Sequence, residues 1–158
     1  MDLFSIDNNE TSQITIYTDG GCHGNPGAGG WGAVLLDGVN EIELSGGENM
    51  TTNNRMELTA AIEVLRYAKE HYPSRKIQLF IDSQYVKNGI TAWIKNWKTK
   101  GWKTADKKAV KNQDLWVALD KLNEESEVEW TWVKGHAGIK YNEVCDSLCQ
   151  MEIAKRSN

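Results

Sequence analysis

Cysteines, long apolar runs and leader-like segments are scarce or absent in this sequence. Its 158 residues include only three cysteines, Cys22, Cys145 and Cys149, and no CxxC pair. This argues against a disulfide framework and favours a reducing cytosol with buried, metal-free thiols; zinc binding is the weaker alternative. No apolar run approaches the roughly 18 residues of a membrane span, and the N-terminus lacks the layout of a signal peptide. We therefore expect a cytoplasmic protein that does not enter a membrane.

Proline, internal repeats and low-complexity segments are equally sparse. The chain has two prolines, 40% hydrophobic residues and 25% charged residues. This composition fits one globular domain better than two domains or a disordered chain. We expect a single domain over residues 1–158, with a short, flexible N-terminal extension over about residues 1–12.

Acidic residues are nearly missing from one stretch. Residues 93–111 hold seven lysines and a single acid, Asp106, so the stretch carries +6 in a chain of net charge −4 and leaves −10 for the rest. Like charges at this density repel one another. A compact basic patch on an acidic body predicts a polyanionic partner at one place and a concentration of carboxylates elsewhere.

The first part of the chain has strand patterns. Residues 14–19 alternate apolar and polar side chains and run into a glycine-rich turn near Asp19. Residues 31–36 and 41–47 are joined by an Asp-Gly turn, which favours a hairpin. We predict an antiparallel meander of three strands.

The pattern changes to alternating helix and strand from Asn53 onward. Apolar residues at helical spacing predict a helix that asparagine caps and that ends before Pro73. The later elements are a strand, a helix capped by Ser83, an amphipathic helix, a strand and a last helix from about Asn142, at 76–82, 83–90, 114–125, 128–133 and 142 onward. This order predicts an α/β fold with a mixed sheet and helices on its faces.

Four acids are candidates for one site. Asp19 and Asp82 each end an apolar strand, and such strand ends line the functional crevice of α/β sheets. Glu57 lies on the core-facing stripe of its helix, where an acid is costly unless it is compensated. Asp146 shares a helix face with Cys149 by the same reasoning.

Each acid also has a purely structural interpretation. Asp19 can form an Asx-turn, Glu57 can complement a helix dipole, Asp82 can cap a helix and Asp146 can be a solvated helix residue. Together they indicate a site for hard cations such as Mg²⁺ or Mn²⁺. Two ions roughly 4 Å apart can activate water and stabilise a leaving oxygen in phosphodiester cleavage.

His136 lies in a loop between Gly135 and Gly138, ten residues before Asp146. Two interpretations are open: a mobile proton-transfer group beside the carboxylates, or a polar turn before a helix.

Five blocks together resemble the type 1 ribonucleases H of bacterial kind. They match in order and spacing from about residue 14 to 149: YTDGGCHGNPGAGGWG, TTNNRMELTAA, IDSQYV, WIKNWKTKGWKTADKKAVKNQDLW, and WVKGHAG followed by NEVCD. The resemblance implies a ribonuclease H-like fold: a five-stranded mixed sheet of three antiparallel and then two parallel strands, flanked by helices, with a basic protrusion at 93–111. It also implies an endonuclease that cuts the RNA strand of RNA–DNA hybrids with two Mg²⁺ ions. Separately, we expect a monomer without an obligate protein partner. The expected products carry 5′-phosphate and 3′-hydroxyl ends, and Mn²⁺ is expected to substitute for Mg²⁺.

The family's catalytic positions fall on five residues of this sequence. By resemblance, Asp19 would bridge the two ions, Asp146 would complete the nucleophile side, and Glu57 and Asp82 would hold the other ion. His136 matches the family's mobile histidine, which assists proton transfer and product release.

The family's hybrid-binding positions also carry over. They fall on Cys22, Asn25, Asn53, Asn54 and Gln84 near the RNA strand, on Thr52 and Asn112 around a DNA-strand phosphate, and on Trp93, Trp97, Lys98, Lys100 and Lys103 in the protrusion. Polar groups near the RNA fit the need to contact 2′-hydroxyls, and lysines with tryptophans suit sugars and phosphates without sequence readout. The tryptophans have an alternative role, because those at 93 and 97 are one helical turn apart and can pack against each other and the body.

Two other functions stay open from the residues alone. One is a DNA nuclease of the same superfold, which shares carboxylates on a similar sheet. The other is a non-catalytic module that binds RNA–DNA hybrids.

Overall fold

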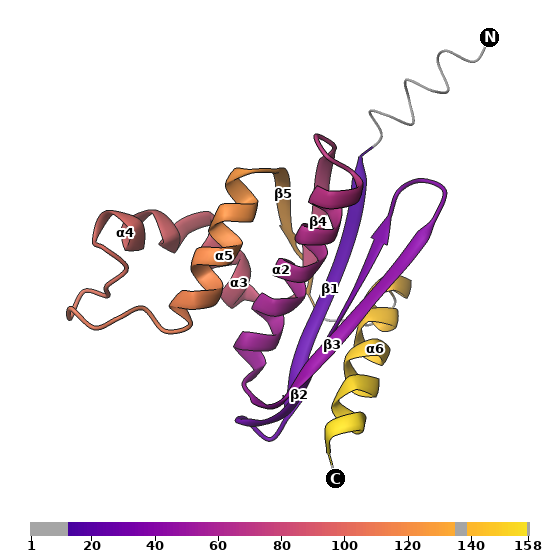
Figure 1. Cartoon of the computed structure of the whole chain (residues 1–158), viewed down its shortest axis with the longest axis horizontal. Coiled ribbons are helices and arrows are strands. Elements are labelled where there is room, and N and C mark those ends of the chain that lie inside the picture. Colours follow the sequence, from indigo (N-terminus) through magenta and orange to yellow (C-terminus); the bar gives the residue numbers. More distant parts are fainter. Residues whose placement is uncertain (1–12, 135–138, 158) are drawn as a thin grey trace.

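The computed structural model describes residues 13–134 and 139–157 (Figure 1). The predicted N-terminal extension over residues 1–12 and the candidate His136 lie outside the described residues.

A five-stranded mixed sheet forms the centre of the fold, as predicted. The strands are β1 (Ile14–His23), β2 (Gly27–Leu36), β3 (Glu41–Thr51), β4 (Lys76–Ile81) and β5 (Glu127–Trp132), in the spatial order β3-β2-β1-β4-β5. The first three pair antiparallel, whereas β4 is parallel to both β1 and β5. Because parallel strands require crossover connections, helices fill the intervals after β3 and β4.

Helices lie on both faces of this sheet. They are α2 (Asn53–His71), α3 (Gln84–Asn88), the π-helical turn η1 (Gly89–Trp93), α4 (Ile94–Thr99), α5 (Gln113–Glu124) and α6 (Lys140–Arg156). In Figure 1, α2 and α5 lie together on one face and α6 lies on the other, while α4 and the loop after it extend away from the body. The predicted basic protrusion is this extension.

Several predicted element boundaries were wrong. β2 begins at Gly27, before the predicted residue 31, and β3 ends at Thr51, after the predicted residue 47. The first strand runs past Asp19 to His23, because its pairing with β2 continues to His23 opposite Ala28. The cap of α2 is Thr52 and not Asn53: Thr52 has an extended backbone, and its side chain accepts a hydrogen bond from the Arg55 N–H at 3.2 Å. The predicted cap Ser83 is confirmed, since its hydroxyl accepts from the Val86 N–H.

The main core lies between the sheet and the α2 and α5 layer. It joins inward-facing strand residues to the apolar stripe of α2 and to Trp116 of α5, and its fully buried members include Ile14, Ile16, Leu35, Leu79, Met56, Leu58, Leu65 and Leu119. The helical spacing predicted from the sequence therefore corresponds to the buried face of α2. This rigid packing fixes the strand ends and the first turns of α2 relative to one another.

Candidate active site

Two candidate acids stand side by side where β1 and β4 pair. The parallel register of these strands ends with Thr18 opposite Ile81, and Asp19 and Asp82 are the next residues along the chain. Neighbouring parallel strands therefore place both carboxylates at one end of the sheet, as the sequence predicts. Asp19 is buried, and Asp82 is partly buried.

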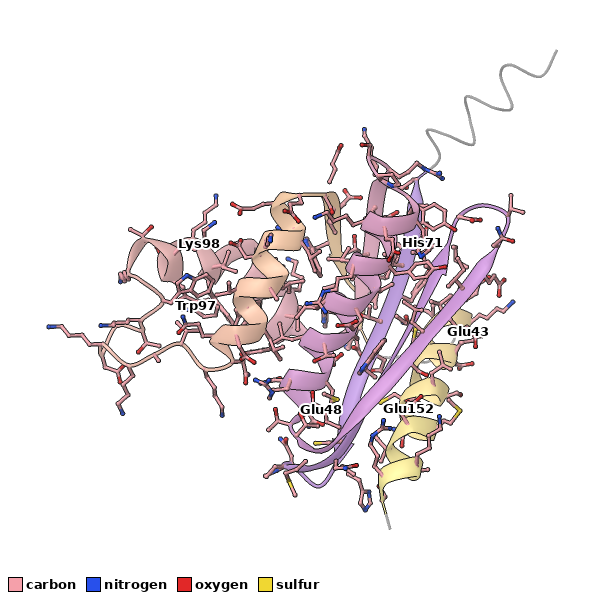
Figure 2. All side chains as sticks on the ribbon, viewed as in Figure 1. Glu43, Glu48, His71, Trp97, Lys98 and Glu152 are labelled. Carbon is pink, nitrogen blue, oxygen red and sulfur yellow. The ribbon has the colours of Figure 1, made fainter. Side chains whose placement is uncertain are left out.

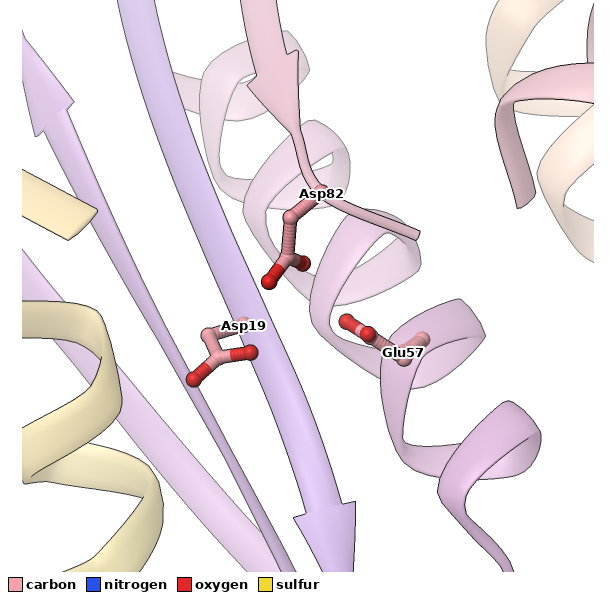
Figure 3. Close-up of side chains that lie close together, drawn as sticks. All are labelled: Asp19, Glu57 and Asp82. Carbon is pink, nitrogen blue, oxygen red and sulfur yellow. The ribbon is translucent and has the colours of Figure 1, made fainter. Parts of the chain in front are cut away.

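The third acid, Glu57, reaches this place from the start of α2. The helix passes so close to β1 that a Cβ atom on Gly20 would lie 2.6 Å from the Met56 carbonyl carbon and 2.7 Å from the Glu57 nitrogen. Only a residue without a side chain permits this approach. One carboxylate oxygen each from Asp19, Glu57 and Asp82 then lie within 4.8 Å of one another, pointing into a common space (Figure 3).

The electrostatics of the three acids favour a bound cation. Burial raises the pKa of Glu57 well above its ordinary value, the charges of Asp82 and Asp19 raise it further, and a hydrogen bond from the Gly20 backbone opposes the shift only in part. The Glu57 Oε1 atom is buried and accepts no hydrogen bond among the described residues. A divalent cation would satisfy this oxygen and screen the mutual repulsion, so the donor set fits a hard metal ion.

The fourth predicted acid, Asp146, comes from the opposite face of the sheet. It lies on α6 and is partly buried, but it is not in the group of oxygens within 4.8 Å of one another. Its charge and those of the site acids act on a common neighbour: the pKa of Cys149 is raised to about 12, mainly by burial and then by Asp19, Glu57 and Asp146. The structure thus brings three acids together and leaves the fourth nearby.

The two thiols of α6 are buried, as predicted. Cys145 Sγ donates to the Tyr17 carbonyl at 3.3 Å, and Cys149 Sγ donates to the Gly30 carbonyl at 3.2 Å. The helix sits directly on β2, because a Cβ atom on Gly30 would lie 2.5 Å from the Cys149 carbonyl oxygen. These contacts attach the helix that carries Asp146 to the sheet.

A second polar cluster gathers three of the candidates for RNA contact. The Cys22 N–H donates to Asn53 Oδ1 at 2.9 Å, and the Asn53 N–H donates to Asn25 Oδ1 at 3.1 Å. Asn54 is exposed in the first turn of α2, and Gln84 is exposed at the start of α3. The end of β1, the following turn and two helix starts therefore present polar groups close to the carboxylates.

Arg55, for which no role was predicted from the sequence, links both candidates for DNA-phosphate contact. Its backbone N–H donates to Thr52 Oγ1, and its guanidinium donates to Asn112 Oδ1 at 3.3 Å. The same guanidinium forms a two-bond ion pair with Asp114 at 3.1 and 2.9 Å. An arginine inside the TTNNRMEL block was the only signal, and its partner on α5 was not evident from spacing.

The tryptophans of the protrusion pack against one another, which confirms the alternative role drawn from their spacing. Ring centroids of Trp97 lie 5.9 Å from Trp93, 6.4 Å from Trp102 and 5.2 Å from Trp116. Trp116 is fully buried, Trp97 is half-buried and Trp93 is 39% exposed. Aromatic packing therefore attaches the base of the protrusion to α5, and Trp93 is the most exposed of these four tryptophans (Figure 2 labels Trp97).

The candidate lysines of the protrusion differ in their partners. Lys98, labelled in Figure 2, forms ion pairs with Glu124 at 2.9 Å and with Asp120 at 3.0 Å, and these bonds raise its pKa. Lys100 and Lys103 are exposed, have no ion pair among the described residues, and line a hollow of about 220 Å³ together with Trp93. They are better placed than Lys98 to meet phosphates.

No helix within residues 13–134 and 139–157 is long and apolar enough to cross a membrane. The expectation from apolar run length agrees with this.

The chain is similar in sequence to proteins of one family. The RNase H family model matches residues 11–154. A ribonuclease H of Ralstonia nicotianae is 55% identical over 147 residues, covering 92% of this chain and 95% of that protein. A ribonuclease H of Cupriavidus pinatubonensis is 54% identical over 142 residues, covering 90% of this chain and 96% of that protein.

Solved structures of RNases H also resemble this chain in fold. LC9-RNase H1, a type 1 RNase H with the type 2 active-site motif, superposes with a TM-score of 0.81 at 30% identity, over 93% of this chain and 74% of that chain. LC11-RNase H1, solved in complex with an RNA/DNA hybrid, has a TM-score of 0.69 at 23% identity over 92% of this chain and 99% of that chain, a likeness of fold. A mixed sheet with three converging carboxylates defines the class, and the chain belongs to the ribonuclease H family.

Proposed function

We propose that this protein is a metal-dependent endonuclease that hydrolyses the RNA strand of RNA–DNA hybrids and leaves 5′-phosphate and 3′-hydroxyl ends. The observation that carries the proposal is the convergence of Asp19, Glu57 and Asp82 in a chain of the ribonuclease H family. The name of its relatives and the hybrid bound to LC11-RNase H1 support the same substrate.

The proposed resident cofactor is Mg²⁺, two ions when substrate is present, with Mn²⁺ able to replace it. Asp19 would bridge the ions, Glu57 and Asp82 would hold one, and Asp146 would complete the side of the attacking water. When bound, such ions lower the pKa of a coordinated water and stabilise the leaving oxygen. The protein's own part is to hold the acids on packed elements, so that their geometry changes little during the reaction.

His136 is proposed to move a proton at the edge of this site and to assist product release, as the family resemblance implies. It lies outside the described residues, and its replacement by alanine should slow turnover less than loss of Asp146 does.

Hybrid binding is proposed to involve both strands. Polar groups would meet the RNA strand at Cys22, Asn25, Asn53, Asn54 and Gln84, and the DNA strand would meet Thr52, Asn112, Trp93, Trp97, Lys98, Lys100 and Lys103. The hydrogen-bonded cluster at the end of β1 supports the first set, because contacts to 2′-hydroxyls distinguish RNA from DNA. In the second set, the ion pairs of Lys98 make Lys100 and Lys103 the foremost candidates for phosphate contact.

We also propose that the chain acts in the cytoplasm as a monomeric, single catalytic domain over residues 1–158. The match of the family model to residues 11–154 supports one functional unit.

The deciding experiment compares cleavage of matched RNA–DNA, DNA–DNA and RNA–RNA duplexes in Mg²⁺, in Mn²⁺ and in EDTA. We expect hybrid cleavage only, lost in EDTA and lost in Asp19→Asn prepared in parallel, which also excludes a contaminating nuclease. Cleavage of duplex DNA would favour a DNA nuclease of the same superfold. Tight hybrid binding without cleavage in either metal would favour a non-catalytic binding module.

A further inference from the structure

We propose that Arg55 is a positioning residue, whose guanidinium orients Asn112 so that its amide donor, beside the Thr52 hydroxyl, faces a phosphate of the bound nucleic acid. This inference rests on the proposed function, since it concerns the DNA-strand phosphate assigned above to those two residues.

Arg55 occupies an acceptor atom on each of the two side chains. Its backbone N–H donates to Thr52 Oγ1 at 3.2 Å, and its guanidinium Nη1 donates to Asn112 Oδ1 at 3.3 Å. A phosphate offers only acceptors, so a site for it must present donors. With both oxygens engaged by Arg55, the groups that remain for a ligand are the Thr52 hydroxyl hydrogen and the Asn112 amide.

The Asn112 side chain is held from its other end as well. Asn112 has a left-handed backbone (φ 61°, ψ 31°) and precedes α5, but its side chain does not cap that helix. Its amide nitrogen instead donates to the Tyr85 hydroxyl oxygen at 3.1 Å. This Tyr85 oxygen also accepts a hydrogen bond from Trp116 Nε1 at 3.0 Å. Only one amide hydrogen is used among the described residues, so the second can serve an anion.

The guanidinium determines which way round the Asn112 amide lies. An amide is nearly symmetric in shape, and the Tyr85 hydroxyl can either accept from the amide nitrogen or donate to the amide oxygen. Tyr85 alone therefore permits both orientations, and the reversed one would turn a carbonyl oxygen toward a phosphate. Arg55 has donors and no acceptor, so it admits only the orientation in which Oδ1 points to it.

Arg55 is suited to orient the amide more than to supply charge. Its guanidinium is engaged by Asp114 through two hydrogen bonds, which largely neutralise it and fix its plane. The pKa of Asp114 is lowered, first by these hydrogen bonds, although partial burial opposes the shift. Direct phosphate contact by Arg55 would have to compete with this pair.

The first test replaces Arg55 with methionine, which keeps the length and the backbone N–H but removes every side-chain donor. We expect KM for hybrid cleavage to rise about tenfold, as for loss of a hydrogen bond to a charged group, with kcat and the salt dependence of KM unchanged. Arg66→Met is the matched control, because Arg66 lies on the same helix in an exposed ion pair with Glu63. Arg55→Lys, which can still donate to Asn112, should recover part of the loss.

Each phosphate that the protein neutralises contributes about 0.9 to the slope of log KM against log salt concentration. A slope that is smaller by about 0.9 in Arg55→Met would therefore mean that Arg55 contacts a phosphate itself. That result, an unchanged KM, or an equal rise in Arg66→Met would each overturn the inference.

The second test asks whether Arg55 acts through Asn112. Asn112→Gly, which suits the left-handed backbone, should raise KM, and adding Arg55→Met to it should cause no further rise. Methylphosphonate linkages, each of which removes the charge of one phosphate, can be placed singly along the DNA strand. At one position the linkage should weaken hybrid binding by the parent, and at that position it should no longer weaken binding by Arg55→Met. Additive effects in the double variant, or an undiminished penalty, would contradict the role.

The same variants can be compared without cleavage, by hybrid dissociation constants in an Asp19→Asn background. If the parent fails to cleave hybrids, the proposed function fails. If the parent cleaves them and Arg55→Met binds as tightly as its background protein, only the role of Arg55 fails.

Discussion

The carboxylate site and the basic protrusion are held in place by different means. The acids Asp19, Glu57 and Asp82 are fixed by strand register and by close helix packing, on elements that belong to the core. The protrusion is attached by a stack of rings and by the ion pairs of Lys98 with α5. Like charges converge at the site and favour a bound cation, whereas part of the protrusion's charge is already compensated within the protein.

The charge of a residue and its exposure must be considered together to judge whether it binds a ligand. In the site, the buried Oε1 atom of Glu57 has no hydrogen-bond partner among the described residues, which favours a cation there. In the protrusion, seven lysines suggested one uniform anion-binding surface, yet one of them is used to satisfy Asp120, which is buried. Residues of one charge within one segment therefore divide into structural and binding groups.

The largest expected effect follows from removing one acid of the site. Glu57→Gln should abolish cleavage in Mg²⁺, and because it removes a charge that its neighbours repel, it should raise the metal-free thermal midpoint by about 2 °C or more. Calorimetry without Mg²⁺ measures the rise in the thermal midpoint, and calorimetry with Mg²⁺ measures the loss of metal-induced stabilisation. Glu63→Gln, at a half-buried acid of the same helix that is paired with Arg66, is the control, and retained cleavage by Glu57→Gln would remove Glu57 from the site.

The next effect distinguishes two tryptophans one helical turn apart. Trp97→Ala should lower the free energy of unfolding by about 2 kcal/mol, because its half-buried ring packs against three others. Trp93→Ala should lower the free energy of unfolding by less than Trp97→Ala does and should raise KM, since Trp93 is 39% exposed and lines a hollow with Lys100. Urea unfolding and steady-state kinetics separate the two outcomes, and equal effects in both assays would show that the stack acts as one unit.

A smaller effect tests the division among the lysines. The double replacement Lys100→Ala and Lys103→Ala should raise KM and reduce the slope of log KM against log salt by about 0.9 for each phosphate that the variant no longer binds, at an unchanged thermal midpoint. Lys98→Ala should lower the thermal midpoint, because Asp120 then lacks its ion-pair partner. If the double variant has the same slope as the parent, neither lysine contacts a phosphate, and both are ordinary solvated surface residues.

The smallest effect belongs to a control outside both regions. In the turn after β2, partial burial would raise the pKa of Asp37, but hydrogen bonds from Asn40, Tyr72 and Val39 lower it below its ordinary value. A lowered folded-state pKa stabilises the fold above the unfolded value, and this contribution is lost as the pH falls through the acid range. Asp37→Asn should therefore lower the thermal midpoint by about 2–4 °C at pH 7 and by less at pH 2. Its cleavage rate should equal that of the parent.

Much of the fold could be predicted from the sequence, because period and turn chemistry are local properties. The alternation in 14–19, the Asp-Gly turn and the stripe along α2 each specify an element, and the order of elements specifies a mixed sheet. Boundaries were less predictable: whether Thr52 or Asn53 caps α2 depends on a backbone angle that neither residue type determines. The π-helical turn between α3 and α4 has no periodic signal, and the predicted helix at 83–90 covered only its first two residues, Gly89 and Ile90.

The site was predictable to a similar depth. Asp19 and Asp82 follow apolar strands, and Glu57 stands out as an acid on an apolar stripe, so their convergence follows from pattern and topology. The distance of Asp146 from the other three depends on how α6 rests on β2, which no local pattern reveals. The partners of Lys98 and Arg55 lie on α5, where residues far apart in the chain meet.

The close approaches at Gly20 and Gly30 have a consequence for protein engineering. At each position a methyl group would overlap the backbone of a facing helix, at Glu57 for Gly20 and at Cys149 for Gly30. In a saturation library selected for activity, both codons should therefore be as intolerant of change as those of the acids, although glycine has no reactive group. A search for catalytic residues by mutational tolerance alone would wrongly include these two glycines. Their contribution is to lack a side chain, which lets a helix pack closely against the sheet.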